Sequence, residues 1–267
     1  MNPKELKLIV QEKYGKIASQ STIQNQSSCC GSTGCCDDMD YTIFSDDYRQ
    51  IEGYNADADL GLGCGIPTQY AAIKKGDHVL DLGSGAGNDC FVARNFVGET
   101  GTVTGIDFTE DMLKKAHNNL KKTDFKNIDF VKGDIENMPL PDNYYNVVIS
   151  NCVLNLVPDK QKAFSEIYRV LRPGGHFCIS DVVIAGELPD KLKDAAEMYA
   201  GCVSGAIQKE EYLRTIQKQG FHDLKVKKEK EIIVPNSILL NYITLDELRT
   251  YKKNRTGIYS ITVIAFK

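Results

Sequence analysis

Short apolar segments alternate with amphipathic segments through the middle of the chain. The apolar runs occupy residues 78–82, 103–106, 128–131, 147–150 and 176–179. Between them, apolar side chains recur near the period of an α-helix at residues 88–97, 110–121 and 159–170, and Pro173-Gly174-Gly175 is expected to stop the last helix. Strands that alternate with helices in this way predict βαβ units and a mostly parallel sheet.

Both ends of the chain depart from this alternation. Residues 4–18 carry apolar side chains near helical spacing and predict one amphipathic helix, whereas residues 19–34 are rich in Ser, Gln, Asn and Gly and predict a linker. After the fifth apolar run, residues 189–200 and 208–219 predict helices, and residues 258–266 alternate like a strand.

These patterns predict a chain in three parts. Residues 1–60 form an N-terminal helix and a cysteine-containing linker, residues 61–184 a Rossmann-like domain, and residues 185–267 a smaller C-terminal α+β module. The predicted fold class is therefore α/β: a Rossmann-like sheet with an N-terminal helical extension and that C-terminal module.

Composition and charge exclude several classes of protein. Of the 267 residues 42% are apolar and 25% charged, as in ordinary globular proteins. The net charge of -4 gives no broad positive field of the kind that nucleic acids and anionic membranes attract. The first ten residues lack the apolar core of a secretory signal, and no stretch approaches the roughly 18 apolar residues of a membrane span. We expect a cytoplasmic protein with no nucleic-acid or membrane partner, whose nine cysteines serve as ligands, nucleophiles or core residues rather than in structural disulfides.

A glycine-rich turn follows the first predicted strand, with the sequence DLGSGAG at residues 81–87. Glycine permits a tight turn and lets a ligand approach the backbone, and the next helix offers unpaired N–H groups at its N-terminus. Asp107 ends the following strand 20 residues after Gly87, where a carboxylate can accept hydrogen bonds from ribose hydroxyls. Asn88 stands where the dinucleotide fingerprint G-x-G-x-x-G has its third glycine, which disfavours NAD. The alternative is a tight βα connection that binds no ligand.

The glycine turn, the acid that ends the second strand and the Gly133-Asp134 pair that ends the third resemble the class I S-adenosylmethionine-dependent methyltransferases. That resemblance implies S-adenosylmethionine as the cofactor, with Asp134 and Ile135 flanking its adenine and Asn151 facing its methionine and methyl end. The expected cofactor-binding residues are Asp81, Gly83, Ser84, Gly85, Gly87, Asp107, Gly133, Asp134, Ile135 and Asn151.

Three cysteines stand in unusual surroundings. Cys152 follows the fourth predicted strand, at the carboxyl end where open α/β sheets bind ligands. Cys64 lies between two glycines and Cys202 follows one, and none of the three has the C-x₂-C partner of a zinc site. If they converge, three soft thiolates select a thiophilic centre such as trivalent arsenic, whose lone pair can attack a sulfonium methyl group. The alternative for each is burial as a small hydrophobic residue.

The segments around these cysteines resemble the arsenite methyltransferases. They read LGLGCG at residues 60–65, SNCVLNLVPDK at 150–160 and GCVSGA at 201–206, and the resemblance spans most of residues 50–267. It implies that Cys64, Cys152 and Cys202 bind arsenite or its thiol conjugates, that the C-terminal module contributes to this site, and that methylated arsenicals and S-adenosylhomocysteine are the products. Leu62 stands where many relatives carry a tyrosine.

The resemblance also implies an N-terminal cysteine in a disulfide relay, regenerated by thioredoxin or a small thiol. This chain offers two adjacent pairs, Cys29-Cys30 and Cys35-Cys36, of which Cys35 or Cys36 is favoured because that pair lies nearer the domain. The alternative is that the pairs form a zinc or heavy-metal knuckle, although adjacent cysteines chelate a tetrahedral ion awkwardly.

Two other functions stay open from the sequence. One is a methyltransferase for a small organic acceptor such as a quinone, sterol or small acid, and the other is a non-enzymatic thiol protein that binds arsenic or mercury. No chemistry is assigned to Cys90 or Cys178, which are expected in the core, or to the four histidines, which show no ligand spacing.

Overall fold

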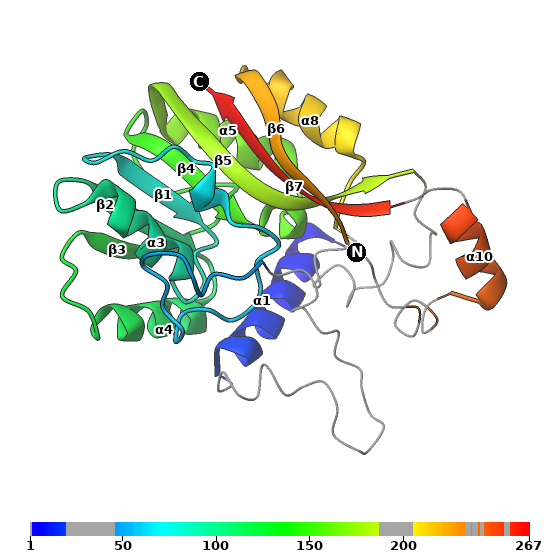
Figure 1. The fold of residues 1–267 in the computed structure, drawn as a ribbon, viewed down its shortest axis with the longest axis horizontal. Coiled ribbons are helices and arrows are strands. Elements are labelled where there is room, and N and C mark those ends of the chain that lie inside the picture. Colours follow the sequence, from blue (N-terminus) through cyan, green and yellow to red (C-terminus); the bar gives the residue numbers. More distant parts are fainter. Residues whose placement is uncertain are drawn as a thin grey trace.

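The computed structural model describes residues 2–19, 46–186, 205–232, 236, 240, 243–253 and 257–267. Its centre is a seven-stranded sheet in the order β3-β2-β1-β4-β5-β7-β6 (Figure 1). The first five strands in sequence are parallel: β1 (His78–Leu82), β2 (Thr102–Asp107), β3 (Ile128–Lys132), β4 (Tyr145–Asn151) and β5 (Leu171–Ala185). Strand β7 (Gly257–Phe266) runs antiparallel between β5 and β6 (His222–Ile232).

Helices cover both faces of the sheet. Helices α3 (Asn88–Val97) and α4 (Glu110–Leu120) pack on one face, and α5 (Lys160–Val170) and α8 (Lys209–Lys218) on the other (Figure 1). Consecutive strand residues show the two layers: Val79 packs in the cluster that includes α3, and Leu80 in the cluster that includes α5 and α8. Because both faces are covered, the inner strands read as nearly continuous apolar runs.

The N-terminal helix α1 (Pro3–Ser19) packs against α4 and reaches the carboxyl ends of β2 and β3. Val10 is buried, and Nε2 of Gln11 donates to the carbonyl of Phe108, just after β2, at 3.2 Å. Lys7 forms ion pairs with Asp134, at 2.6 Å, and with Glu136, both just after β3. These contacts place α1 beside the edge of the sheet where ligands bind in this class of fold.

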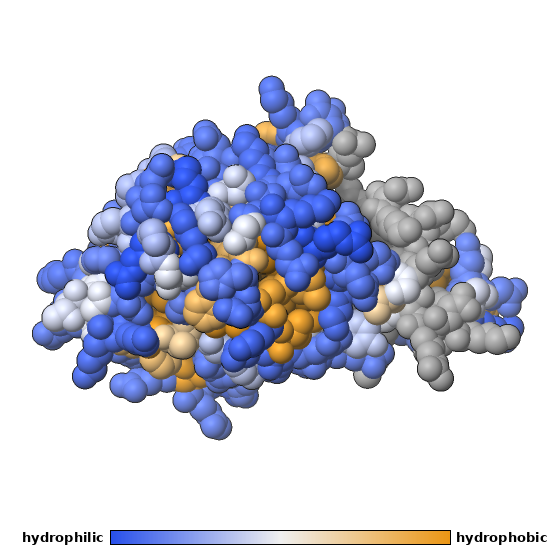
Figure 2. Space-filling model, turned by 90° about the horizontal axis from the view of Figure 1, so that it is seen from above, coloured by the Kyte–Doolittle hydropathy of each residue, from blue (hydrophilic) through white to orange (hydrophobic). Residues whose placement is uncertain are grey.

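Two 3₁₀ helices and one further helix complete the described part of the chain. They are η2 (Pro67–Gln69), η3 (Leu154–Leu156) and α10 (Leu245–Lys253). No described helix combines the length and the hydropathy needed to cross a membrane. The face shown in Figure 2 is mostly hydrophilic, and its apolar residues gather mainly in one central region.

The structure confirms most of the predicted elements. The bounds of β1 and α3 are as predicted, and α1, α4, α5, α8 and β7 differ from the predictions by one or two residues. The prediction for Pro173-Gly174-Gly175 was wrong in part: α5 ends at Val170, but β5 begins at the next residue and runs through this segment. Strand β6 and helix α10 were not predicted, and β7 and β6 continue the main sheet. The predicted linker, apart from Ser19, and the predicted helix at 189–200 lie outside the described residues.

Candidate active site

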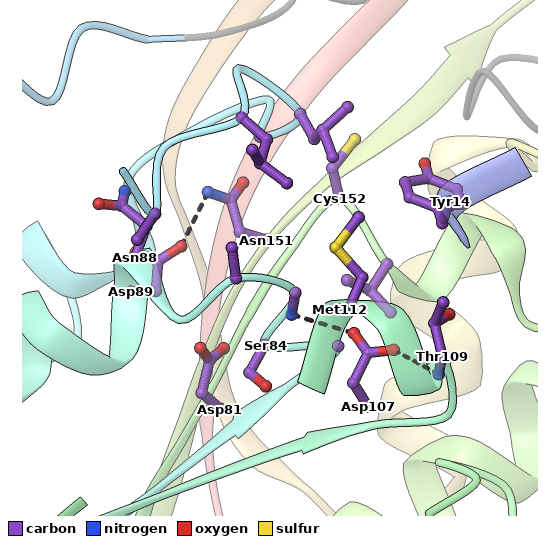
Figure 3. Close-up of a pocket in the computed structure, with 18 of the residues that line it drawn as sticks. Tyr14, Asp81, Ser84, Asn88, Asp89, Asp107, Thr109, Met112, Asn151 and Cys152 are labelled. Carbon is purple, nitrogen blue, oxygen red and sulfur yellow. Dashed lines mark hydrogen bonds between the residues drawn. The ribbon is translucent and has the colours of Figure 1, made fainter. Parts of the chain in front are cut away.

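A cleft opens at the carboxyl ends of β1, β2 and β4, and encloses about 930 Å³ including the part open to solvent (Figure 3). Val10 and Tyr14 of α1 line it from one side. Most of the residues predicted to bind the cofactor line it as well, together with one of the predicted thiols: Asp81, Gly83, Ser84, Gly85, Asp107, Ile135, Asn151 and Cys152.

The glycine turn needs its glycines for different reasons. Gly83, Gly85 and Gly87 all have positive φ angles, of 64°, 51° and 96°. At Gly83 a Cβ atom would lie 2.6 Å from the side chain of Val153. At Gly87, the N-cap residue of α3, a Cβ atom would lie 2.8 Å from the side chain of Phe130. At Gly85 the nearest atom would be Sδ of Met112, at 3.9 Å. The backbone of Gly85 therefore faces open space in the cleft, where a ligand can approach it.

Asp107 is buried at the end of β2 and holds the glycine turn (Figure 3). One carboxylate oxygen accepts a hydrogen bond from the N–H of Gly85 at 3.0 Å, and the other from the N–H of Thr109 at 2.8 Å. Burial raises the pKa of Asp107, although these N–H groups favour the charged form. Each carboxylate oxygen can accept a further hydrogen bond, so Asp107 can still bind ligand hydroxyls.

Two more buried carboxyl groups face the cleft, at Asp81 and Asp89. Burial, with the nearby charge of Asp89, raises the pKa of Asp81 well above its ordinary value, and burial raises the pKa of Asp89 to about 6. The thiol of Cys90, predicted to be a core residue and fully buried, donates to Asp81 at 3.2 Å. A ligand cation near these carboxyl groups would favour their charged forms. Asp89 was missed from the sequence because an acid in the first turn of a helix is common there for its effect on the helix dipole.

The structure brings two of the three predicted arsenic ligands to the same place. Asn151 accepts hydrogen bonds through Oδ1 from the N–H of Cys64 at 3.1 Å and of Gly65 at 3.3 Å. Cys152, the residue after Asn151, donates its N–H to the carbonyl of Ser180 at 2.8 Å. Both cysteines are buried, 1% and 4% exposed.

The pKa of the buried Tyr212 hydroxyl is affected by the charges of both cysteines. Burial raises its pKa most, and the charges of Asp181, Cys64 and Cys152 raise it further. Among the described residues, no group of three or more His, Cys, Asp or Glu side chains is placed to hold a metal ion. Cys202, Cys35 and Cys36 lie outside the described residues, so the third predicted ligand and the relay stay predictions.

The predicted residues after β3 divide into two kinds. Ile135 lines the cleft, whereas Asp134 forms an ion pair with Lys7 of α1. Gly133 donates its N–H to the carbonyl of Asp107 at 3.0 Å, and a Cβ atom there would lie 2.6 Å from Ile106. Gly133 therefore sets the path of the chain beside Asp107, and the contact of Asp134 with adenine stays a prediction.

Comparisons with known proteins agree with this geometry. The model of the methyltransferase domain family matches residues 73–220. The arsenite methyltransferase of Halobacterium salinarum is 42% identical over 246 residues, which are 86% of this chain and 61% of that protein. The solved structure of an arsenic(III) S-adenosylmethionine methyltransferase from Chlamydomonas reinhardtii is 35% identical, with a TM-score of 0.65 over 77% of this chain and 67% of that one.

The chain belongs to the arsenite methyltransferase family. The human arsenite methyltransferase is 36% identical over 193 residues, which are 67% of this chain and 52% of that protein. This member of the family thus spans about three fifths of the Halobacterium relative and about half of the human one.

The cleft of this arsenite methyltransferase family member fits S-adenosylmethionine, the cofactor of the class. Within the described residues, Oγ of Ser84 and Oδ1 of Asn88 are buried without a hydrogen-bond partner, and both residues line the cleft. Asp59, Asp81, Asp89 and Asp107 also line it, which complements a cofactor that carries a sulfonium and an ammonium group. A bound S-adenosylmethionine would supply hydrogen-bond partners for these polar atoms and positive charge beside these acids.

Proposed function

We propose that this protein methylates trivalent arsenic with S-adenosylmethionine as the methyl donor and so converts arsenite to methylated arsenicals. The observation that carries the proposal is the hydrogen bond from the N–H of Cys64 to Asn151, the residue before Cys152, at the edge of the cofactor cleft. Cys152 also has a positive φ of 61°, which is uncommon and costly for a non-glycine residue, and strained backbone of this kind clusters at active sites. The named relatives act on arsenite or arsenic(III), which supports the same substrate here.

The cofactor is held by the residues that line the cleft. Asp107 would accept hydrogen bonds from the ribose hydroxyls, the open backbone at Gly85 would allow close approach, and Asp81 and Asp89 would face the cationic methionine end. Ile135 would pack beside the adenine. The same acids favour the charged cofactor over its neutral-sulfur product, because the product lacks the sulfonium charge.

The chemistry needs a soft ligand set more than it needs an acid or a base. Thiolates of Cys64 and Cys152, with Cys202 from the C-terminal part of the chain as the third ligand, hold arsenic and leave its lone pair available as the nucleophile. S-adenosylmethionine supplies an electrophilic methyl group and leaves as a neutral sulfide. No proton moves at the reacting atoms, so the protein contributes mainly by aligning the two reactants, an effect that can reach about 7–11 kcal/mol.

Methyl transfer oxidises arsenic by two electrons, which two thiols return when they form a disulfide. We assign this step to Cys35 or Cys36 together with a thiol of the arsenic site, and the recovery of the dithiol to thioredoxin or a small thiol. Such a cycle belongs in the reducing cytoplasm, where thiols are maintained.

An acceptor panel tests the proposed activity. The protein is incubated with methyl-labelled S-adenosylmethionine and a thiol reductant, and either arsenite or a set of quinones, sterols and small acids. We expect the label in methylated arsenicals and not in the organic acceptors. Label in an organic acceptor alone would make the protein a different small-molecule methyltransferase, and arsenic binding without label transfer would make it a thiol-based metalloid-binding protein.

A further inference from the structure

Asp89 lies between the cofactor cleft and the loop that carries Cys64. It is the second residue of α3, lines the cleft and is only 9% exposed. Its carboxylate accepts hydrogen bonds from the hydroxyl of Tyr48 at 2.8 Å. It also accepts one from Nδ2 of Asn151 at 3.2 Å (Figure 3). Both of these side-chain donors are neutral groups.

The Asn151 amide has one orientation that satisfies all its neighbours. The two hydrogens on its Nδ2 are shared among three acceptors: Asp89, the Tyr48 hydroxyl at 2.8 Å and the carbonyl of Gly65 at 2.9 Å. Its Oδ1 accepts from the N–H groups of Cys64 and Gly65. A flipped amide would set Oδ1 against the Asp89 carboxylate and Nδ2 against two N–H donors. The negative charge of Asp89 therefore selects the orientation in which Asn151 holds the Cys64 loop.

We propose that Asp89 is a positioning residue that couples the two binding sites, so that a cationic ligand beside Asp81 and Asp89 tightens the binding of a trivalent arsenical at Cys64 and Cys152. The inference rests on the proposed function, which takes these two cysteines as the arsenical site. The cofactor's positive charge favours the ionised form of Asp89, and an ionised carboxylate accepts stronger hydrogen bonds than a protonated one. Asn151 is then held more firmly, and the loop that it anchors loses less freedom when Cys64 binds arsenic.

Coupling between the two sites predicts a thermodynamic effect that a purely structural role of Asp89 does not predict. If the cofactor site strengthens arsenical binding by some factor, the arsenical strengthens cofactor binding by the same factor. If Asp89 only supported the fold, its replacement would change the arsenical affinity by the same factor with and without a bound cofactor analogue. The ratio of those two arsenical affinities would then stay the same. The ratio of arsenical affinities with and without a cofactor analogue is therefore the quantity to measure.

The test uses S-adenosylhomocysteine, which keeps the ammonium group and cannot react, and arsenite, whose three sulfur bonds include one to Cys64. Titrations of the arsenical, with and without saturating S-adenosylhomocysteine, compare the parent chain with its Asp89→Asn variant. Asp77→Asn is the matched control, because Asp77 is equally buried but bonds to the N–H of Lys74 away from the cleft. Adjacent thiols would bind the arsenical themselves, so every chain also carries four replacements: Cys29→Ser, Cys30→Ser, Cys35→Ser and Cys36→Ser.

At pH 5, below the pKa of about 6 that burial gives Asp89, we expect S-adenosylhomocysteine to tighten arsenical binding roughly 5-fold or more in the parent and in Asp77→Asn, and to leave it nearly unchanged in Asp89→Asn. A ratio near one in the parent, or an undiminished ratio in Asp89→Asn, would overturn the coupling. If Asp89→Asn does not fold, Tyr48→Phe removes the hydroxyl that joins Asp89 to Asn151 and should lower the ratio in its place; an undiminished ratio there overturns the coupling equally. If the parent does not bind the arsenical at all, the proposed function fails, and the coupling fails with it.

Discussion

Oδ1 of Asn151 accepts a hydrogen bond of 3.1 Å from the backbone N–H of Cys64, across 87 residues of sequence. Nδ2 of the same side chain donates to the carbonyl of Gly65, so one amide holds both the donor and acceptor sides of this glycine-flanked loop. Because Cys152 follows Asn151 in the chain, this contact sets one thiol-bearing loop against the strand end that carries the other thiol. The two cysteine segments therefore lie together at the edge of the cofactor cleft.

Substitution of the first thiol separates two arsenic substrates. A monomethylated trivalent arsenical needs only two sulfur bonds, whereas arsenite uses three, so Cys64→Ser should keep activity toward the methylated substrate and lose it toward arsenite. Initial rates with the two substrates at equal concentration measure the difference. Retention of both activities would show that Cys64 does not bind arsenic, and loss of both would show that the methylated substrate needs Cys64 as well.

Cofactor affinity should depend on Asp107. Alanine at this position removes the acceptor for ribose hydroxyls and leaves the N–H groups of Gly85 and Thr109 without their partner. Hydrogen bonds to charged groups contribute about 1.5–3 kcal/mol, so Asp107→Ala should weaken S-adenosylmethionine binding by roughly 10- to 100-fold while the fold persists. Calorimetric titration gives the affinity and circular dichroism checks the fold; an unchanged affinity in folded protein contradicts the assigned role.

Much of the fold was predictable because the inner strands are apolar and the helices between them are amphipathic. The limits of β1 and α3 follow directly from the apolar run that ends at Leu82 and from the glycine turn after it. Strand β6 gave no such signal. It lies at the edge of the sheet with mostly exposed side chains and reads HDLKVKKEKEI, a charged sequence of the kind that protects an edge strand from pairing with other chains.

The site was predictable where a motif sits at a strand end, and less so where contacts join distant segments. Asp107 and Cys152 each end a predicted strand, and the topology of parallel sheets places such residues together. Nothing in the sequence around Tyr48 or Asp89 indicates that they meet at Asn151, since this network depends on three segments folding against one another. Asn151 was predicted to face the methionine end of the cofactor, and the structure adds its contact with the Cys64 loop.

The N-terminal thiols should matter for turnover more than for capture of arsenic. Replacement of Cys29, Cys30, Cys35 and Cys36 together by serine leaves Cys64, Cys152 and Cys202 in place, so the protein should still bind trivalent arsenic. Repeated methylation of arsenite should fall sharply, because the disulfide relay lacks its partner. Multiple-turnover assays with a protein dithiol as reductant measure this; full activity would remove the relay from the account.

Stability should vary with pH through Asp181. This carboxyl group is fully buried in β5 and accepts a hydrogen bond of 3.0 Å from the hydroxyl of Tyr212. Burial raises its pKa from 3.8 to about 7, so as pH rises the unfolded chain releases this proton before the folded chain does. The group therefore lowers the free energy of unfolding progressively between pH 3.8 and about 7, and has no effect below this window, where both states hold the proton.

Asn cannot ionise at this position and keeps a partner for the Tyr212 hydroxyl. Each pKa unit corresponds to about 1.4 kcal/mol, so Asp181→Asn should exceed the parent in free energy of unfolding by on the order of 2–4 kcal/mol at neutral pH. The difference should shrink toward zero as the pH falls below 3.8, where both states of the parent hold the proton. Urea unfolding of both proteins across this range tests the sign, and a difference that does not change with pH would contradict it.

The measurement that bears most directly on the account is arsenite methylation by Cys152→Ser, with Cys178→Ser as the matched control. Cys152 lines the cleft, whereas Cys178 is buried in the core between the sheet and α3. Serine exchanges a soft ligand for a hard hydroxyl, so transfer of labelled methyl to arsenite should collapse in Cys152→Ser while its S-adenosylmethionine affinity stays close to that of the parent. Cys178→Ser, if folded, should keep its turnover. Arsenite turnover in Cys152→Ser equal to that of the parent would contradict a thiolate arsenic site in this protein.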